Sequence, residues 1–292
     1  MFPALSTVTN DKGELDEEGF RSEIRQNIEW GAHGLCPAII AGEFYKFSEE
    51  ERVKQFEITV DEANGKVPVL VGVTHTGTEP AVMLTKKAKD IGADGVIIMP
   101  PYFRRVEASL TLYEHFSTIA KRVDIPIMLQ DAEDLTGVHM CPTLYARLAK
   151  EFDNIVSVKV EGALTLQKIA DVRAVLGDKL IIFGGMAARL LMQELALGAA
   201  GNIPDACLTD LLVDVYESYK AGKVEKAQQI FSKYKVWVDF LSLHGNSNIE
   251  VEKETLRLRG VIKSSHAREP NIPMSKTDKV ELKSLLEKIG LI

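Results

Sequence analysis

The sequence has few of the features that mark disulfide-rich, membrane-spanning or nucleic-acid-binding proteins. Its 292 residues include three cysteines, Cys36, Cys141 and Cys207, which lie far apart and form no CxxC pair. Such cysteines are typical of a reduced intracellular enzyme and argue against a disulfide scaffold or a zinc site. No apolar run approaches the roughly 20 residues of a membrane-spanning helix. A formal net charge of -7, without a dense block of lysine and arginine, argues against a nucleic-acid-binding surface.

The N-terminal residues also lack the basic region and the apolar stretch of a signal peptide, so we expect a cytoplasmic protein with no membrane partner. Hydrophobic residues make up 46% of the chain and charged residues 26%, which is typical of a globular protein with a sizeable core. The chain length is within the range of one (β/α)8 barrel.

Short apolar runs alternate with amphipathic stretches along most of the chain. The runs that predict strands are residues 4–8, 34–40, 67–73, 95–99, 126–130, 155–160, 180–183 and 200–203. The stretches that predict helices between them include residues 48–64, 110–123, 142–152 and 164–176. Ser48 with Glu51 has the pattern of a capping box at the first of these helices. Eight strands, each followed by a helix, predict an α/β fold of the (β/α)8 TIM-barrel class.

A repeated glycine pattern supports this fold. Gly31, Gly92 and Gly198 each begin a Gly-Ala-x-Gly sequence that follows a helical stretch and precedes a predicted strand. A glycine in the left-handed conformation can end a helix, and the next strand then starts at once. A doubly wound sheet is the second choice, because no strand-linked GxGxxG motif with an acidic partner is present.

The strand patterns stop near residue 208 of the sequence. Helical patterns then cover residues 208–221, 224–243, 249–260 and 275–289. We therefore predict a catalytic barrel at residues 1–222 and an appended helical segment at residues 223–292. Ser275 or Thr277 is the expected N-cap of the last helix.

The strand predicted at residues 155–160 carries an unusual charged pair. The strand is rich in β-branched residues, which suit a buried strand, yet Lys159 lies near its end and Glu161 follows two residues later. A lysine in an apolar pocket has a depressed pKa, and its neutral amine can form a Schiff base with a ketone. Because side chains alternate along a strand, Glu161 is expected on the same side as Lys159, about 7 Å further along. The simpler interpretation is a lysine that reaches solvent from a strand end.

A series of short motifs spans nearly the whole chain. They are residues 3–7, Gly42-Glu43, residues 48–52, residues 100–102, Thr136-Gly137, Lys159 and residues 183–185. In order and spacing they resemble the dihydrodipicolinate synthase / N-acetylneuraminate lyase superfamily of class I aldolases and lyases. In that superfamily the lysine that ends the sixth strand forms an iminium with pyruvate or another 2-oxo acid, and the resemblance implies this role for Lys159. It also implies a homo-oligomer, either a dimer or a tetramer.

Five positions depart from the pattern of the dihydrodipicolinate synthases. Ile40 and Ala41 stand where a Gly-Thr-Thr-Gly-Glu motif has two hydroxyls. Gln130 and Phe103 replace two tyrosines, and Leu135 takes the place of an arginine that receives a second substrate carboxylate. Without these hydroxyls a Tyr–Thr–Tyr proton relay cannot operate at neutral pH. The departures favour the sugar-acid branch, which includes the 2-keto-3-deoxyarabonate dehydratases.

Three residues are the catalytic candidates. Lys159 is the predicted nucleophile, and Glu161 is the predicted acid and base for the C3 proton or a C4 hydroxyl. Gln130 is predicted to hydrogen-bond a substrate hydroxyl or a water. Alternatively, Glu161 forms a structural ion pair or caps a helix, and Gln130 only fills the space of a tyrosine.

The predicted substrate-binding residues lie near strand ends. They are Ile40, Ala41, Gly42, His75, Tyr102, Gly184, Gly185 and Ile203. Ile40 and Ala41 would bind the substrate carboxylate through backbone N–H groups, and Gly42 would allow the close approach of the backbone there. Glu43 beside them is expected to be structural. A polar loop explains His75 equally well, and a tight turn explains the two glycines. We expect no cofactor and no metal, because the other histidines lack metal-ligand spacing and iminium chemistry requires no metal.

The leading prediction is a lyase, a dehydratase or a retro-aldolase, that forms a Schiff base with a 2-oxo acid such as a 2-keto-3-deoxy sugar acid or pyruvate. One alternative is a dihydrodipicolinate synthase, which condenses pyruvate with aspartate semialdehyde, with an atypical proton relay. Another alternative is a barrel that binds a 2-oxo acid without catalysis. Retention of Lys159 within a hydrophobic strand counts against this last hypothesis.

Overall fold

The computed structural model describes residues 1–102, 109–245 and 248–292. Phe103, one of the departures noted above, lies outside the described residues. By their contacts the residues divide into two compact units, Pro68–Ile203 in one and Met1–Val67 with Pro204–Ile292 in the other. Large side chains are fully buried in both units, including Tyr145 in the first and Trp237 in the second.

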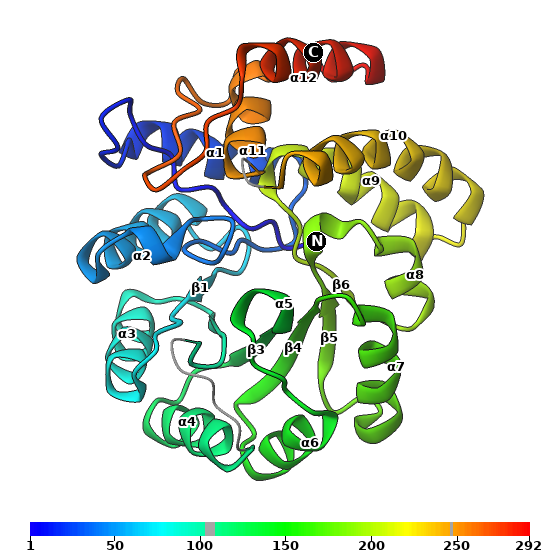
Figure 1. Cartoon of the computed structure of the whole chain (residues 1–292). Helices are drawn as coiled ribbons and strands as arrows, with labels where there is room; N and C mark the ends of the chain where they lie inside the picture. Colours follow the sequence, from blue (N-terminus) through cyan, green and yellow to red (C-terminus); the bar gives the residue numbers. More distant parts are fainter. Residues whose placement is uncertain (103–108, 246–247) are drawn as a thin grey trace. The chain divides into compact units, whose positions relative to one another are not determined.

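The described part of the unit Pro68–Ile203 contains a six-stranded parallel sheet whose strand order follows the sequence. The strands are β1 (Leu70–Gly72), β2 (Gly95–Ile98), β3 (Ile127–Ala132), β4 (Ile155–Glu161), β5 (Ile181–Gly184) and β6 (Gly201–Asn202). The helices are α3 (Thr78–Ile91), α4 (Ser109–Arg122), α5 (Glu133–Thr136), α6 (Pro142–Glu151), α7 (Thr165–Leu176), α8 (Leu191–Ala196) and the short 3-10 turn η2 (Met186–Ala188). Figure 1 shows that the sheet curls and that the longer helices lie along its outer side. Consecutive parallel strands joined by helices are the βαβ units that a barrel requires.

Strand β4 pairs with β3 on one side and β5 on the other. The register places Lys159 opposite Gln130 on β3 and opposite Phe183 on β5. Val158 and Val160 are completely buried, as expected for the apolar run that predicted this strand. Because the strands are parallel, their carboxyl ends meet at one edge of the sheet, and the residues at those ends come together there.

The glycine pattern predicted to end helices is confirmed. Gly31, Gly92 and Gly198 have φ values of 83°, 95° and 86°. In each case the alanine that follows donates its N–H to a carbonyl in the last turns of the helix, as in a Schellman motif. Glycine is needed at these positions because a side chain disfavours positive φ.

The unit formed by Met1–Val67 and Pro204–Ile292 is mostly helical. Its elements are α1 (Glu17–Glu29), η1 (Phe44–Lys46), α2 (Glu49–Ala63), η3 (Ala206–Leu208), α9 (Thr209–Lys220), α10 (Val224–Leu243), α11 (Asn248–Leu258) and α12 (Lys276–Ile289). Ser48 caps α2 and Ser275 caps α12, both in reciprocal capping boxes, which confirms these two predicted caps. The predicted boundary between residues 222 and 223 falls in the turn between α9 and α10 and stays a prediction.

Residues 4–8 and 34–40 do not form the full strands predicted for them. Ala4 makes only isolated parallel bridges, with Cys36 and with Asp205. A proline adjoins each of these three residues, and a proline has no N–H to extend a ladder. The sequence pattern therefore overestimated the length of these two strands.

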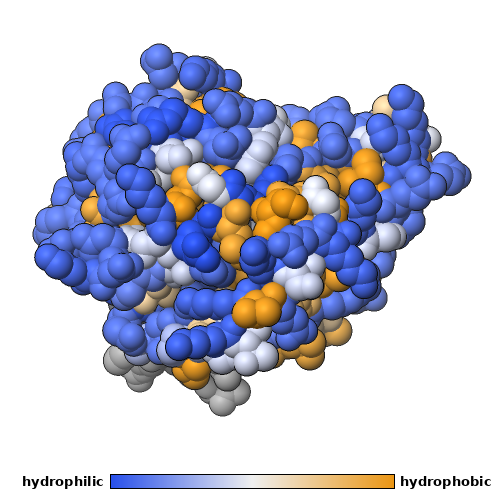
Figure 2. Space-filling model, turned by 90° about the horizontal axis from the view of Figure 1, so that it is seen from above, coloured by the Kyte–Doolittle hydropathy of each residue, from blue (hydrophilic) through white to orange (hydrophobic). Residues whose placement is uncertain are grey.

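Hydrophilic residues cover most of the face seen in Figure 2, and the hydrophobic residues on it form separate smaller patches. Exposed apolar side chains on α10 and α12 include Val236, Leu243 and Val280. Within the described ranges, no helix is both long enough and apolar enough to cross a membrane.

Candidate active site

Lys159 is buried at the carboxyl-terminal half of β4. Its side chain is 4% exposed, and its Nζ lies 3.0 Å from Oε1 of Glu161. The interpretation of a lysine that reaches solvent is therefore wrong. Strand periodicity correctly placed both side chains on one face of the sheet. Among the described residues, no second acceptor contacts Lys159 Nζ.

Glu161 is contacted by residues of three different segments, through the ion pair with Lys159 and two hydrogen bonds. Its Oε1 also accepts the N–H of Met186 at 3.0 Å, and its Oε2 accepts Nε2 of Gln130 at 2.6 Å. The structure thus brings the three predicted catalytic residues, Lys159, Glu161 and Gln130, into one buried chain of contacts. Glu161 forms an ion pair with Lys159, which was the alternative to its predicted role as a catalytic acid and base. An ion pair of this kind also places a proton acceptor directly beside the amine.

Gly184 and Gly185 lie between two carboxylates. A Cβ at Gly184 would collide with the carboxylate of Glu194, and a Cβ at Gly185 would collide with that of Glu161. The two glycines therefore leave room for carboxylates of the protein itself. Their predicted role in substrate binding stays a prediction.

Glu194 and Asn202 were missed by the sequence analysis. Glu194 on α8 is 1% exposed, and its Oε2 accepts Nδ2 of Asn202 at 2.7 Å. The pKa of Glu194 is raised to about 7, mainly by burial and in part by the nearby Glu161 carboxylate, against the hydrogen bond from Asn202. An acidic residue among the buried apolar residues of α8 was the available signal for this group.

A second buried group lies on the other face of β3, since Asp131 follows Gln130 along the strand. Asp131 accepts hydrogen bonds from Tyr145 and, at 2.7 Å, from Lys168 Nζ, which also contacts Glu133 at 3.2 Å. Burial raises the pKa of Asp131. These contacts tie the start of α5 to α6 and α7, so they hold the acidic turn that follows Gln130.

His75 belongs to a different place in the same unit. Its Nδ1 accepts the N–H of Gly77, and it lines a pocket of about 650 Å³. The pocket is also lined by residues 76–79, Pro101, Thr111, Glu114, His115 and Thr118. Lys159, Glu161 and Gln130 are not among its lining residues. The predicted substrate contact of His75 therefore stays a prediction.

The predicted carboxylate-binding residues Ile40, Ala41 and Gly42 belong to the other unit. They form a turn that ends at Glu43 in the left-handed conformation, with φ 54°. Within the described residues, the three N–H groups donate to no protein acceptor. A Cβ at Gly42 would lie 2.9 Å from the carbonyl oxygen of Leu5, so glycine is required there. Successive N–H groups of this kind can bind an anion, which agrees with the predicted role.

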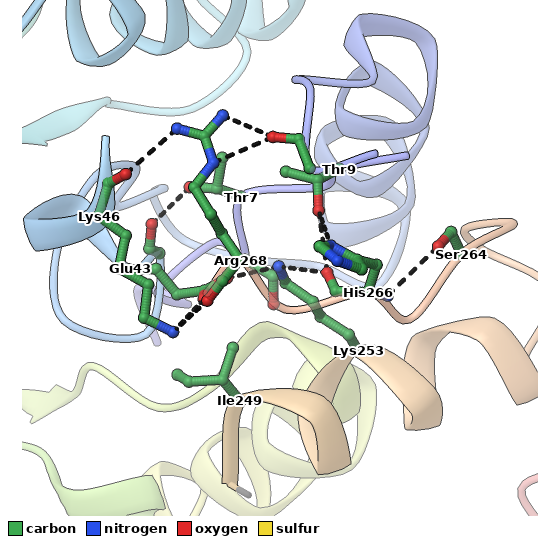
Figure 3. Close-up of polar contacts among 12 residues, drawn as sticks. Thr7, Thr9, Glu43, Lys46, Ile249, Lys253, Ser264, His266 and Arg268 are labelled. Carbon is green, nitrogen blue, oxygen red and sulfur yellow. Dashed lines mark hydrogen bonds and ion pairs between the residues drawn. The ribbon is translucent and has the colours of Figure 1, made fainter. Parts of the chain in front are cut away.

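Glu43 is held by two buried lysines, as Figure 3 shows. Lys46 Nζ donates to its Oε1 at 2.9 Å, and Lys253 Nζ donates to its Oε2. The two ammonium groups also donate to the carbonyls of Arg268 and His266, at 2.7 and 2.9 Å. The expectation that Glu43 is a structural hydrogen-bond partner agrees with these contacts.

The other two predicted substrate-binding residues are Tyr102 and Ile203. Tyr102 is partly exposed, and Ile203 is 2% exposed and donates its N–H to the carbonyl of Gly184 at 3.1 Å. Their substrate contacts stay predictions. In the described residues, no group of three or more His, Cys, Asp or Glu side chains is arranged to hold a metal ion.

Comparison with known proteins shows the family. Residues 1–289 match the model of the Dihydrodipicolinate synthetase family, so the chain belongs to that family. A 4-hydroxy-tetrahydrodipicolinate synthase of Methanopyrus kandleri is 33% identical over 100% of this chain and 96% of its own length. A 4-hydroxy-tetrahydrodipicolinate synthase of Syntrophobacter fumaroxidans is 34% identical over 96% of this chain and 95% of its own.

Solved structures agree with this assignment. A dihydrodipicolinate synthase from Aquifex aeolicus has a TM-score of 0.92 and 28% identity, covering 99% of this chain and 97% of its own. YagE from Escherichia coli K12, a prophage protein of the same family in complex with pyruvate, has a TM-score of 0.90 and 26% identity, covering 100% and 98%. The fold class is therefore the predicted TIM-barrel class with C-terminal helices. The chain is an enzyme of the lyase class, which argues against the non-catalytic barrel.

Proposed function

We propose that the chain forms a Schiff base between Lys159 and the C2 ketone of pyruvate or a related 2-oxo acid. The observation that carries the proposal is the buried contact between Lys159 and Glu161 at the end of β4. The complex of YagE with pyruvate, in a relative 26% identical, supports pyruvate as the substrate.

The residues around Lys159 suit the steps of this reaction. Glu161 takes a proton from the Lys159 ammonium, and the free amine then attacks C2. The carbinolamine loses water with the help of the protonated Glu161, and an iminium forms. The iminium withdraws electrons from C3, so that Glu161 can remove a C3 proton and leave an enamine. The enamine carbon can then attack an aldehyde. In the reverse direction, a C–C bond is cleaved.

Condensation with aspartate semialdehyde is the favoured second step. The curated relatives, 33% and 34% identical, carry the name 4-hydroxy-tetrahydrodipicolinate synthase. The names of these relatives favour the synthase over the sugar-acid lyase. The residues that depart from the synthase pattern had favoured the sugar-acid lyase. The chain would need a proton relay that does not use tyrosine at position 130. Gln130 and Glu161, joined at 2.6 Å, are the groups available there.

A 2-keto-3-deoxy sugar acid remains the second candidate substrate. Leu135, at the position of the arginine for a second carboxylate, is 68% exposed and has no charge. Glu133 and Asp134 beside it are acidic, which disfavours a second substrate carboxylate. Hydroxyl groups at C4 and beyond would suit Gln130 as a hydrogen-bond donor and acceptor.

Borohydride reduction in the presence of pyruvate, followed by peptide mass spectrometry, tests the Schiff base. We expect irreversible labelling at Lys159 and none in Lys159→Met. Lys168→Met is the matched control, because it removes another buried lysine from the same unit and should keep the label. Absence of labelling with pyruvate and with a panel of 2-keto-3-deoxy acids would contradict the proposal.

Turnover then separates the two candidate substrates. Consumption of pyruvate that depends on aspartate semialdehyde identifies the synthase, and release of pyruvate or water from a 2-keto-3-deoxy acid identifies the lyase. We also propose that the enzyme needs no cofactor and is a homo-oligomer, a dimer or a tetramer. Activity after exhaustive chelation, and the mass measured by light scattering, test these two points.

A further inference from the structure

The segment after β5 has an unusual backbone. Met186, Ala187 and Ala188 all have φ of 52°, in the left-handed region that residues with a side chain rarely occupy in succession. Each such residue is destabilised relative to a right-handed conformation, because its Cβ approaches the following carbonyl oxygen. A short left-handed turn therefore persists only because the contacts around it hold it in place.

Two carboxylates make these contacts at the start of the turn. Glu161 accepts the N–H of Met186 at 3.0 Å, on one side of the chain. Glu194 accepts Nδ2 of Asn202 at 2.7 Å. Asn202 Nδ2 also donates to the carbonyl oxygen of Gly185, at 3.3 Å. Gly185 is thus held at its carbonyl by Asn202 of β6, and Glu194 of α8 orients the Asn202 amide.

Stability alone does not account for this arrangement. Glu194 is 1% exposed and Asn202 is completely buried, and Asn202 Oδ1 has no partner in the described residues. The nearest charged groups that act on Glu194 are Glu161, which repels it, and Lys159. Apolar side chains of similar size would fill the space without the cost of burying a carboxylate and an amide. We therefore look for a role of Glu194 and Asn202 other than stabilising the fold.

We propose that Glu194 and Asn202 are positioning residues for Glu161. By holding Gly185, they fix the left-handed turn so that the N–H of Met186 keeps the Glu161 carboxylate beside Lys159. The inference rests on the proposed function, because it assigns proton transfer at C3 to Glu161. Neither residue needs to contact substrate for this role.

Exchange of the pyruvate methyl protons in D2O, followed by NMR, reports proton transfer at C3 without a second substrate. In the iminium, the C3–H bond breaks, Glu161 takes the proton, and the enamine forms. Glu161 then exchanges its proton with solvent and returns a deuteron to C3. Borohydride labelling at Lys159 reports iminium formation separately, so the two steps can be compared in each variant.

The variants are Glu194→Leu, Asn202→Val and the conservative Glu194→Gln. In Glu194→Gln, the amide oxygen at position 194 can still accept Nδ2 of Asn202, which keeps its contact with the Gly185 carbonyl. We expect methyl exchange in Glu194→Leu to slow by about 10- to 100-fold, as for a misplaced catalytic group, with labelling at Lys159 retained. Glu194→Gln should retain most of the wild-type rate. Gln193→Leu, at an exposed position of the same helix, is the control and should exchange at the wild-type rate.

The inference is overturned if Glu194→Leu exchanges at the wild-type rate, or if Glu194→Gln is as slow as Glu194→Leu. If Glu194→Leu does not fold, as judged by thermal melting, Asn202→Val decides by the same readout. Failure of the wild type to label at Lys159 would instead overturn the proposed function. The two failures are therefore distinguishable.

Discussion

Two buried groups of lysines and glutamates, one in each unit, differ in how fully their charges are paired. Around Glu43, two ammonium groups share one carboxylate, and each also donates to a backbone carbonyl. Around Lys159, one ammonium group meets Glu161, and a second carboxylate, Glu194, lies nearby. In direct contact, Glu43 thus has two ammonium partners, whereas Lys159 has one carboxylate partner.

This difference agrees with a structural role for the first group and with the reactive role proposed for Lys159. A buried lysine with several acceptors is held in one position by those contacts. A lysine with one carboxylate partner can pass its proton to that partner and become a nucleophile. A neighbouring carboxyl with a pKa near 7 adds a further site for a proton at neutral pH. The comparison predicts that substitutions in the two groups affect different measurements.

The largest expected effect is on proton transfer in Glu161→Gln. Loss of the carboxylate should slow exchange of the pyruvate methyl protons by about 10²- to 10⁴-fold, the usual contribution of a general base. Labelling of Lys159 by borohydride should continue, though more slowly, because the amine remains. NMR in D2O and peptide mass spectrometry measure the two effects. A wild-type exchange rate in this variant would remove Glu161 from the mechanism.

The next effect is on stability, in Lys253→Met. This change leaves the buried Glu43 carboxylate with one ammonium partner, and we expect the free energy of unfolding to fall by about 3–5 kcal/mol. Urea unfolding measures the loss, and adding Glu43→Gln to the variant should recover part of it. Lys159→Met is the matched comparison and should cost less, because Glu161 keeps the donors Gln130 and Met186. An equal or greater cost in Lys159→Met would contradict the distinction between the two groups.

The pH dependence of stability sharpens the comparison further. Burial raises the pKa of Glu23, near Lys253, to about 8, while the same group in the unfolded chain titrates near its ordinary value of 4.5. Between these two pH values the unfolded chain loses a proton that the folded chain keeps. Stability therefore falls as pH rises through this window, by up to about 5 kcal/mol from this group.

Glu23→Gln should remove this part of the pH dependence. Its Oε1 still accepts the Ser6 N–H, which lies 2.8 Å away in the wild type. Urea unfolding at pH 5 and pH 8 should show a smaller loss of stability in the variant than in the wild type. An equal loss of stability between pH 5 and pH 8 in the two proteins would show that the pKa of Glu23 is not raised in the folded state.

The smallest effect is expected at the left-handed turn, in Ala187→Gly. Ala187 has φ 52° and ψ 29°, and a glycine adopts this conformation without the steric penalty of a Cβ. We expect stabilisation of about 1 kcal/mol, measured as a higher midpoint of thermal unfolding. Ala196→Gly, in the right-handed helix α8, is the control and should destabilise by about 1 kcal/mol. A loss of stability in Ala187→Gly would mean that the turn is not strained.

Local patterns in the sequence predicted the features that depend on near neighbours. The alternation along residues 155–161 placed Lys159 and Glu161 on one side of a buried strand, because side-chain direction repeats every two residues. Gly92 and Gly198 predicted helix ends because the left-handed backbone that ends a helix favours glycine. Ser48 and Ser275 predicted helix starts for a similar local reason. The motifs that resembled the family were also local, and the family assignment agrees with them.

The sequence by itself determined the strand that carries Lys159, the helices around it and the family of the enzyme. Only the tertiary structure decided that Gln130 meets Glu161, that Glu194 and Asn202 hold Gly185, and that Lys253 meets Glu43 across 210 positions of sequence. The physical reason is burial. A polar side chain taken from water must find a partner, and which partner it finds depends on the packing of segments that no local pattern relates.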